Sequence, residues 1–194
     1  MADEFDPLVI TLAVTETLDV LRVPYFIGGS LASILYGMIR TTNDADLIAR
    51  LHREQVDPLV TALSSSFYLD RDAVMDAIAR RSVFNLIHLE TMFKVDVYVA
   101  KGRPFDQSRF QRRTKQALLH NPDRTAYIGS AEDTMLAKLE WYQLGEQVSE
   151  RQWRDVLGII KARGDKLDLE YLREWASNLG IADLLEQALV AARQ

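Results

Sequence analysis

The chain has 194 residues, of which 48% are hydrophobic and 26% are charged, a balance typical of a folded globular protein. The net charge of −5 argues against a protein that binds nucleic acid over its whole surface, and the lack of cysteine excludes disulfides and cysteine-ligated zinc. No run of eighteen apolar residues occurs and the acidic N-terminus lacks a signal peptide's basic segment, so we expect a cytoplasmic protein without a membrane span.

The first hundred residues are predicted to alternate between helices and strands. Apolar spacing predicts helices at 7–22, 30–38, 53–66 and 70–81, strands at 23–29 and 43–51, and an antiparallel hairpin at 83–100. In the second strand of that hairpin Asp96 and Tyr98 share one face, and the valines at 95, 97 and 99 share the other, because strand side chains alternate.

The rest of the chain is predicted to be mostly helical. The basic segment 101–115 is interpreted as a connecting helix with loops, and 125–130 as a last short strand. Ser130 is expected to cap a helix, Ser149 and Gln152 to form a capping box for the next, and Gly164 to end that helix. We therefore expect an α/β (α+β) fold: a mixed-sheet core at 1–129 and a helical region at 130–194 that packs on it.

Three aspartates are the strongest indication of chemistry. Asp44 and Asp46 are two residues apart on a predicted strand, so they point to the same face, and Asp96 lies on another strand. If the two strands are neighbours, three carboxylates converge and need a counter-charge. Mg²⁺ prefers oxygen ligands and leaves positions for substrate phosphates, and two such ions can clamp an in-line displacement.

A glycine turn precedes the aspartates. Gly28 and Gly29 permit close backbone approach, and the helix that follows would present free N–H groups at its N-terminus, where Ser30 could add a hydroxyl. A phosphate cradle together with metal-binding carboxylates points to phosphoryl or nucleotidyl transfer.

These residues resemble the nucleotidyltransferase superfamily of DNA polymerase beta. Gly29-Ser30, then thirteen residues, then Asp44-Ala45-Asp46 and a later Asp96 between hydrophobic residues follow the family pattern, although Gly28 stands where the family has a large apolar residue. The resemblance implies a nucleotidyltransferase-like mixed sheet and transfer of NMP from an NTP. It also implies that Asp44 and Asp46 bind two Mg²⁺ ions, and that Asp96 binds one and helps to deprotonate the acceptor.

A closer resemblance is to bacterial minimal nucleotidyltransferases of the AbiEii toxin type. Their "GG-x-A…R-x-T-x-D-x-D" stretch is similar to Gly28 through Asp46, with Arg40 in the arginine position, and their downstream helices are similar to those around Lys138 and Asp155. The resemblance implies that the glycines and Ser30 hold the triphosphate, that Lys138 neutralises its charge and that Asp155 orients it. It also implies ATP or another NTP as substrate and a toxin–antitoxin context with a cognate antitoxin or other partner protein.

Structural explanations remain open for each residue. Asp44 would also suit a turn residue after Asn43, and Ser30 would cap its helix in any case. Arg40 would alternatively pair with Asp44, and Lys138 and Asp155 would form a surface ion pair. The acceptor is also open among an RNA, a protein and a small molecule such as an aminoglycoside, with the basic, aromatic-bearing segment 101–115 favouring RNA. The alternative function is a non-catalytic nucleotide- or partner-binding module with the same fold.

Overall fold

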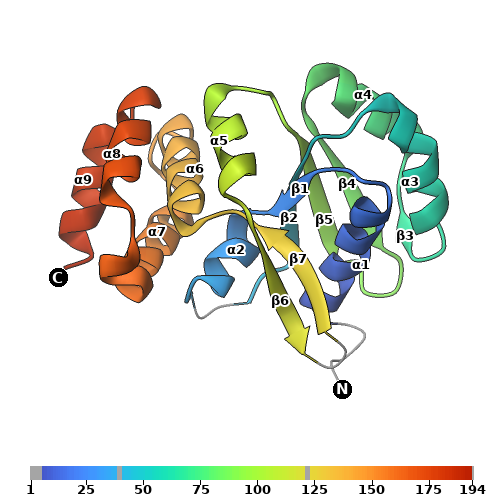
Figure 1. The fold of residues 1–194 in the computed structure, drawn as a ribbon, viewed down its shortest axis with the longest axis horizontal. Coiled ribbons are helices and arrows are strands. Elements are labelled where there is room, and N and C mark those ends of the chain that lie inside the picture. Colours follow the sequence, from blue (N-terminus) through green and yellow to red (C-terminus); the bar gives the residue numbers. More distant parts are fainter. Residues whose placement is uncertain (1–5, 39–40, 121–122, 194) are drawn as a thin grey trace. The chain divides into compact units, whose positions relative to one another are not determined.

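The computed structural model describes residues 6–38, 41–120 and 123–193 (Figure 1). The chain divides into two compact units. The first unit comprises Met1–Gly28 and Thr42–Ile128, and the second comprises Gly29–Thr41 and Gly129–Gln194. The chain therefore leaves the first unit directly after Gly28 and returns to it just before the predicted aspartate strand.

The first unit is built on a mixed sheet of seven strands, in the order β3-β4-β5-β2-β1-β7-β6. The strands are β1 (Tyr25–Ile27), β2 (Asp44–Ala49), β3 (Phe67–Tyr68), β4 (Val83–His88), β5 (Lys94–Val99), β6 (Thr114–His120) and β7 (Asp123–Ile128). Strand β2 runs parallel to β5, and β1 parallel to β7, whereas the other neighbours are antiparallel. The predicted α/β class with a mixed sheet is confirmed.

The first unit also contains helices. They are α1 (Pro7–Val20), the 3-10 turn η1 (Arg53–Gln55), α3 (Val56–Leu63), α4 (Arg71–Arg80) and α5 (Pro104–Arg112). Helix α1 begins where it does because Asp6 accepts a hydrogen bond from the Leu8 amide at 2.7 Å and Pro7 fits the first helical position. Helices α1 and α4 contact both the sheet and α3, which lies between them in this packing.

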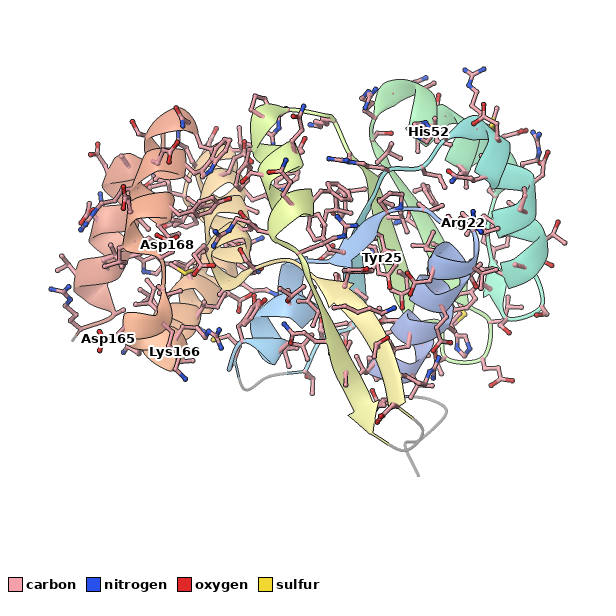
Figure 2. The ribbon with its side chains drawn as sticks, in the orientation of Figure 1. Arg22, Tyr25, His52, Asp165, Lys166 and Asp168 are labelled. Atoms are coloured by element: carbon pink, nitrogen blue, oxygen red, sulfur yellow. The ribbon has the colours of Figure 1, made fainter. Side chains whose placement is uncertain are left out.

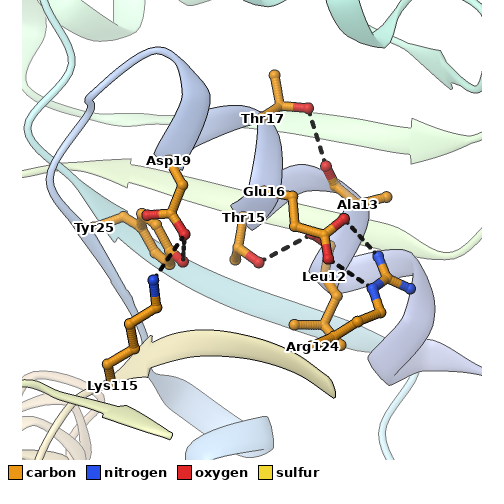
Figure 3. A network of polar contacts seen from close by, with 9 residues as sticks. All are labelled: Leu12, Ala13, Thr15, Glu16, Thr17, Asp19, Tyr25, Lys115 and Arg124. Carbon is orange, nitrogen blue, oxygen red and sulfur yellow. Dashed lines mark hydrogen bonds and ion pairs between the residues drawn. The ribbon is translucent and has the colours of Figure 1, made fainter. Parts of the chain in front are cut away.

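Polar contacts fasten α1 to the strands (Figure 3). Arg124 on β7 donates two hydrogen bonds to Glu16, at 2.6 and 2.8 Å, in the bidentate geometry that makes arginine–carboxylate pairs specific. The Tyr25 hydroxyl donates to Asp19 at 3.3 Å, and burial followed by the charge of Asp19 raises the pKa of Tyr25. Strand β1, which ends at the glycine turn, is thus fixed against α1.

The two faces of the central strands β2 and β5 differ in character. Ala45, Leu47, Val95 and Val97 point to one face and are fully buried, which is the apolar side expected from the valine alternation. The opposite face carries the aspartates, so burial of the first face sets the direction in which the carboxylates point.

The second unit is helical. It contains α2 (Gly29–Leu35), α6 (Ala131–Leu144), α7 (Glu150–Arg163), the 3-10 turn η2 (Gly164–Lys166), α8 (Leu169–Asn178) and α9 (Ala182–Ala191). Ser130 caps α6 by accepting from the Asp133 amide at 3.0 Å, and Gly164 ends α7 with a φ of +49°, as predicted. Asp165, Lys166 and Asp168 lie in the connection between α7 and α8 (Figure 2).

Some predicted elements were wrong in detail. The segment 101–115 was expected to hold only a helix and loops, but β6 begins at Thr114 and pairs with β7 at the sheet edge, with a bulge between Ala117 and Leu119. The two-residue β3 was not predicted at all. Helix α2 begins at Gly29, so Ser30 lies in its first turn and is not the residue before it. No helix among the described residues is both long and apolar enough to cross a membrane.

Candidate functional site

The three aspartates of the first unit lie on one face of two neighbouring strands. In the parallel pairing of β2 with β5, Asp46 lies directly opposite Asp96, and Asp44 lies opposite Lys94. Neighbouring strands are about 4.8 Å apart, so the Asp46 and Asp96 backbones are adjacent and their side chains leave the same face. Asp44 and Asp46 are half-buried and Asp96 is 8% exposed.

Two polar side chains hold the Asp96 carboxylate. Lys94, two residues earlier on β5, places its Nζ 2.8 Å from Oδ2, and Asn85 on β4 donates to Oδ1 from the position directly across the antiparallel ladder. Thr42 orients Asp44 in a similar way. Its hydroxyl lies within hydrogen-bond distance of the Asp44 carboxylate, at 3.0 Å, and of the Asp44 backbone carbonyl, at 2.9 Å. The carboxylates of Asp44 and Asp96 are therefore each oriented by neighbouring side chains.

Shifted pKa values report the shared negative field of these acids. Burial, and then the charges of Asp46, Asp96 and Asp44 in that order, together raise the pKa of Tyr98 to about 12. The hydrogen bond to Asp96 raises the pKa of Lys94, and the charges of Asp96, Asp44 and Asp46 add to this. Both groups therefore sense all three carboxylates.

Gly28 connects the glycine turn to the aspartate strand. Its amide donates to the Asp46 carbonyl at 2.9 Å, so this N–H belongs to the sheet and is not offered to a phosphate. A Cβ at Gly28 would lie 2.7 Å from Cδ1 of Ile48, which is closer than real Cβ contacts occur. Glycine thus fits the packing against β2, since any side chain here would force the Ile48 methyl group to shift, whatever the role of Gly28 toward a nucleotide.

In the second unit, Ser30 meets an arginine that was not predicted. Arg151 on α7 donates from Nη2 to the Ser30 hydroxyl at 2.8 Å, and Ser30 is 7% exposed. Arg151 lies one turn before Asp155 on the same helix. Because residues four apart share a helix face, this spacing was the sequence signal that could have identified Arg151 as a site residue. Gly29, which opens α2, has a φ of +53° that glycine adopts without strain.

Lys138 and Asp155 bind each other in the interior of the second unit. Lys138 Nζ lies 2.7 Å from Asp155 Oδ2 and 3.1 Å from the Gln152 side-chain oxygen, and the two charged side chains are 6% and 2% exposed. The Gln152 side chain therefore accepts from Lys138. Of the predicted capping box, the structure shows the contact of the Gln152 backbone N–H with the Ser149 hydroxyl, at 3.5 Å. Arg40 lies outside the described residues.

The donor set of the first unit fits a hard divalent cation. Its oxygens come from three carboxylates on one face, and Mg²⁺ uses such oxygens with few protein ligands. Within the described ranges, no three His, Cys, Asp or Glu side chains are gathered tightly enough to enclose an ion, since Asp96 is turned to Lys94 and Asn85. Ion binding would require Lys94 to give up its place at Asp96.

Known proteins were compared with the chain at the level of sequence and of structure. No family model matches the sequence, and no curated protein matches it significantly. Solved structures do match. An antigenic nucleotidyltransferase-like protein from Paracoccidioides brasiliensis aligns with 98% of this chain and 94% of its own at 21% identity and a TM-score of 0.56.

Two antibiotic adenylyltransferases are also similar in structure. ANT(2″)-Ia in complex with adenylyl-2″-tobramycin aligns with 88% of this chain and 97% of its own, at 13% identity and a TM-score of 0.58. The lincosamide adenylyltransferase LnuA, bound to lincomycin, aligns with 79% and 94%, at 15% identity and a TM-score of 0.50. The chain has the nucleotidyltransferase fold. At these identities the likeness concerns the fold alone.

Proposed function

We propose that this protein is a nucleotidyltransferase that moves an NMP group from an NTP to an acceptor hydroxyl. The observation that supports it most is the register of β2 and β5, which places Asp46 beside Asp96 with Asp44 on the same face. Lys94 pairs with one of the three carboxylates, and the remaining negative charge is costly unless a cationic ligand balances it, so the arrangement suits a metal-bound triphosphate.

In the proposed reaction the acceptor oxygen forms a bond to the α-phosphorus while the bond from that phosphorus to the pyrophosphate oxygen breaks. Pyrophosphate leaves with the bonding electrons, and the proton of the acceptor hydroxyl passes to Asp96. Asp44 and Asp46 would hold Mg²⁺ together with Asp96, and the ions supply charge neutralisation to the phosphates. Thr42 and Asn85 orient Asp44 and Asp96, so the chain's main contribution is positioning.

The remaining assignments are part of the same proposal. Ser30 and Gly29 would contact the triphosphate, with Arg151 as an additional cation at Ser30. The buried pair of Lys138 and Asp155 would serve nucleotide binding by holding α6 and α7 together around this arginine. Which NTP is used is left to experiment, with ATP as the first to test because two structural neighbours are adenylyltransferases.

Thermal unfolding with each NTP, with and without Mg²⁺, tests the proposal. A ligand that binds only the folded state raises the midpoint, by an amount equivalent to about 2.7 kcal/mol at a concentration 100 times its Kd. We expect a shift that requires Mg²⁺ and is lost in Asp46→Asn. If no NTP shifts the midpoint under either condition, the proposed substrate class is wrong.

One observation favours a second candidate, a non-catalytic nucleotide-binding module. The Lys94 ammonium occupies the carboxylate that the reaction needs as a base. Under this alternative, NTP raises the unfolding midpoint without Mg²⁺, and no NMP is transferred.

A toxin role is a further hypothesis from the AbiEii resemblance: induced expression should arrest growth with the wild type and not with Asp46→Ala.

A further inference from the structure

A row of alternating positive charges and aromatic rings crosses the first unit. We call it the cation–aromatic row, and its members are Arg50, Phe110, Arg113, Tyr127 and Lys115. The Arg50 guanidinium lies 4.1 Å from the Phe110 ring centre, and that of Arg113 lies 5.4 Å from Phe110 and 4.7 Å from Tyr127. The Lys115 ammonium follows at 5.6 Å from Tyr127.

The rings hold the guanidinium groups in place. Phe110 is 2% exposed and belongs to a buried cluster with Phe26, Ile48 and Ala100, against which Tyr127 also packs. Its ring meets Phe26 edge to face at 5.0 Å between centres. Because Phe110 is covered, it cannot stack on a ligand, and its effect is to fix the two arginines that lie on its faces.

The charges of this row are poorly compensated. Among the described residues, neither Arg50 nor Arg113 forms an ion pair with a carboxylate; Arg113 Nη1 donates to the Phe110 backbone carbonyl, and the buried Arg113 Nε has no hydrogen-bond partner. Lys115 has Asp19 at 3.9 Å, near the limit of an ion pair (Figure 3). In a chain of net charge −5, like charges held side by side in this way are stabilised by an anionic ligand.

A cavity of about 350 Å³ opens at one end of the row. It is lined by Arg50, Gly102, Gln107, Phe110, Gln111 and Arg113. The volume lies at the lower end of the range of ligand-binding pockets, and the two glutamine amides add uncharged donors and acceptors to the arginines. The cavity therefore suits an anionic group that carries further polar atoms, such as a phosphate on a sugar.

The row and the carboxylates lie on the same face of β2. Asp46 and Ile48 occupy alternate positions on β2, and Arg50 directly follows the strand at the next alternate position, about 13 Å along the chain from Asp46. Arg109 bridges part of this distance, since its guanidinium lies 4.8 Å from the Phe26 ring centre and its Nη2 is 3.9 Å from where a Gly28 Cβ would be. Positive charge thus extends from the row toward the end of the strand that bears the aspartates.

From this geometry we infer that the cation–aromatic row binds the sugar-phosphate backbone of a single-stranded nucleic acid. Three cations connected through two rings match the repeated charges of a polyanion better than one small anion, and they would repel a cationic acceptor such as an aminoglycoside. Contacts to phosphates fix the position of a strand and carry no sequence information. This agrees with the burial of Phe110, because a covered ring cannot stack on a base. The inference rests on the proposed function in one respect only, that the bound strand would be the acceptor.

Binding of a fluorescent RNA of about twelve nucleotides, followed by anisotropy in the absence of NTP and Mg²⁺, tests the inference. We expect Arg50→Gln/Arg113→Gln to reduce the slope of log affinity against log salt by about 1.4, because each contact to a single strand contributes about 0.7. Between about 50 and 200 mM salt, wild-type binding should therefore weaken about sevenfold more than binding by the variant.

Two matched variants serve as controls for the change in slope. Arg71→Gln/Arg80→Gln removes the same charge from α4, where these arginines pair with Asp57 and Asp76, and it should keep the wild-type slope. Arg50→Lys/Arg113→Lys keeps the charge and should also keep most of the slope of log affinity against log salt.

Three results would overturn the inference: no RNA binding by the wild type, an equal loss in the α4 control, or competition by a free nucleoside monophosphate as effective as by unlabelled RNA. The binding assay contains no NTP, so its result does not depend on the proposed function. If the protein binds RNA but a separate assay finds no NMP transfer to any acceptor, the proposed function alone is refuted. Transfer to another acceptor without RNA binding would refute the row alone.

Discussion

Replacing Asp155 by Asn is predicted to destabilise the second unit strongly. Asp155 is the counter-charge of Lys138, at 2.7 Å, and both side chains are almost fully buried. Asparagine keeps the shape but removes the charge, so the buried Lys138 ammonium loses its ion pair with Asp155, while the neutral Gln152 oxygen stays at 3.1 Å. Removing one partner of a buried pair costs about 3–5 kcal/mol.

The second unit offers a selective probe for this measurement. All three tryptophans, Trp141, Trp153 and Trp175, lie in it, so their fluorescence during urea unfolding follows that unit. With a urea slope of about 1.5 kcal/mol/M, a loss of 3–5 kcal/mol lowers the unfolding midpoint by about 2–3 M. The apolar variant Lys138→Met/Asp155→Leu should return to within about 2 kcal/mol of the wild type, because it removes both charges of this buried pair together.

Arg154→Gln is the control on the same helix. Arg154 pairs with Glu150 at 2.6 Å, but both side chains are exposed, so the loss should stay below about 0.5 kcal/mol. The reasoning is refuted if Asp155→Asn lowers the midpoint no more than this control does. A folded apolar variant that no longer shows the NTP-dependent shift would support the role of the pair in nucleotide binding.

Three further predictions concern the first unit. Gly28→Ala should destabilise the protein by about 1–3 kcal/mol in urea unfolding, and Ile48→Val, which removes the methyl group 2.7 Å from the new Cβ, should recover most of the loss; no recovery would contradict the packing argument. Asp46→Asn should lower the pKa of Tyr98 from about 12 toward its ordinary value, since a negative charge that opposes phenolate formation is gone, and an unchanged ultraviolet titration would speak against the shared field. Lys94→Gln should bind Mn²⁺ up to about fivefold more tightly by electron paramagnetic resonance, because a competing cation has left the carboxylates; weaker binding would show that Lys94 helps to hold the ion.

Local periodicity was sufficient to predict much of the first unit. The alternation of Val95, Asp96 and Val97 gave the correct faces of β5, and the two-residue spacing of Asp44 and Asp46 placed them on one face of β2. These predictions succeed because side-chain direction in a strand depends only on the parity of the position, which does not require knowledge of the partner strand.

Pairing between distant segments could not be predicted in the same way. The register that sets Asp46 beside Asp96 joins residues fifty positions apart and depends on packing of the whole sheet. Asn85 was not predicted either, because the hairpin was predicted without a register, and the observed register is what places Asn85 across from Asp96. Strand β6 was missed since its residues, beginning at Thr114, follow a basic helix without a turn signal and the strand carries a bulge.

Transfer of label from an NTP labelled on its α-phosphate is the measurement that tests the proposed function most directly. The wild-type protein is incubated with each common NTP, Mg²⁺ and a mixture of RNA, protein and small-molecule acceptors, and the label is followed into product. The proposal predicts transfer by the wild type with at least one NTP, and a rate lower by about 100-fold or more for Asp46→Asn. Equal rates for the two proteins, or NTP binding by the wild type without transfer to any acceptor class, would contradict it.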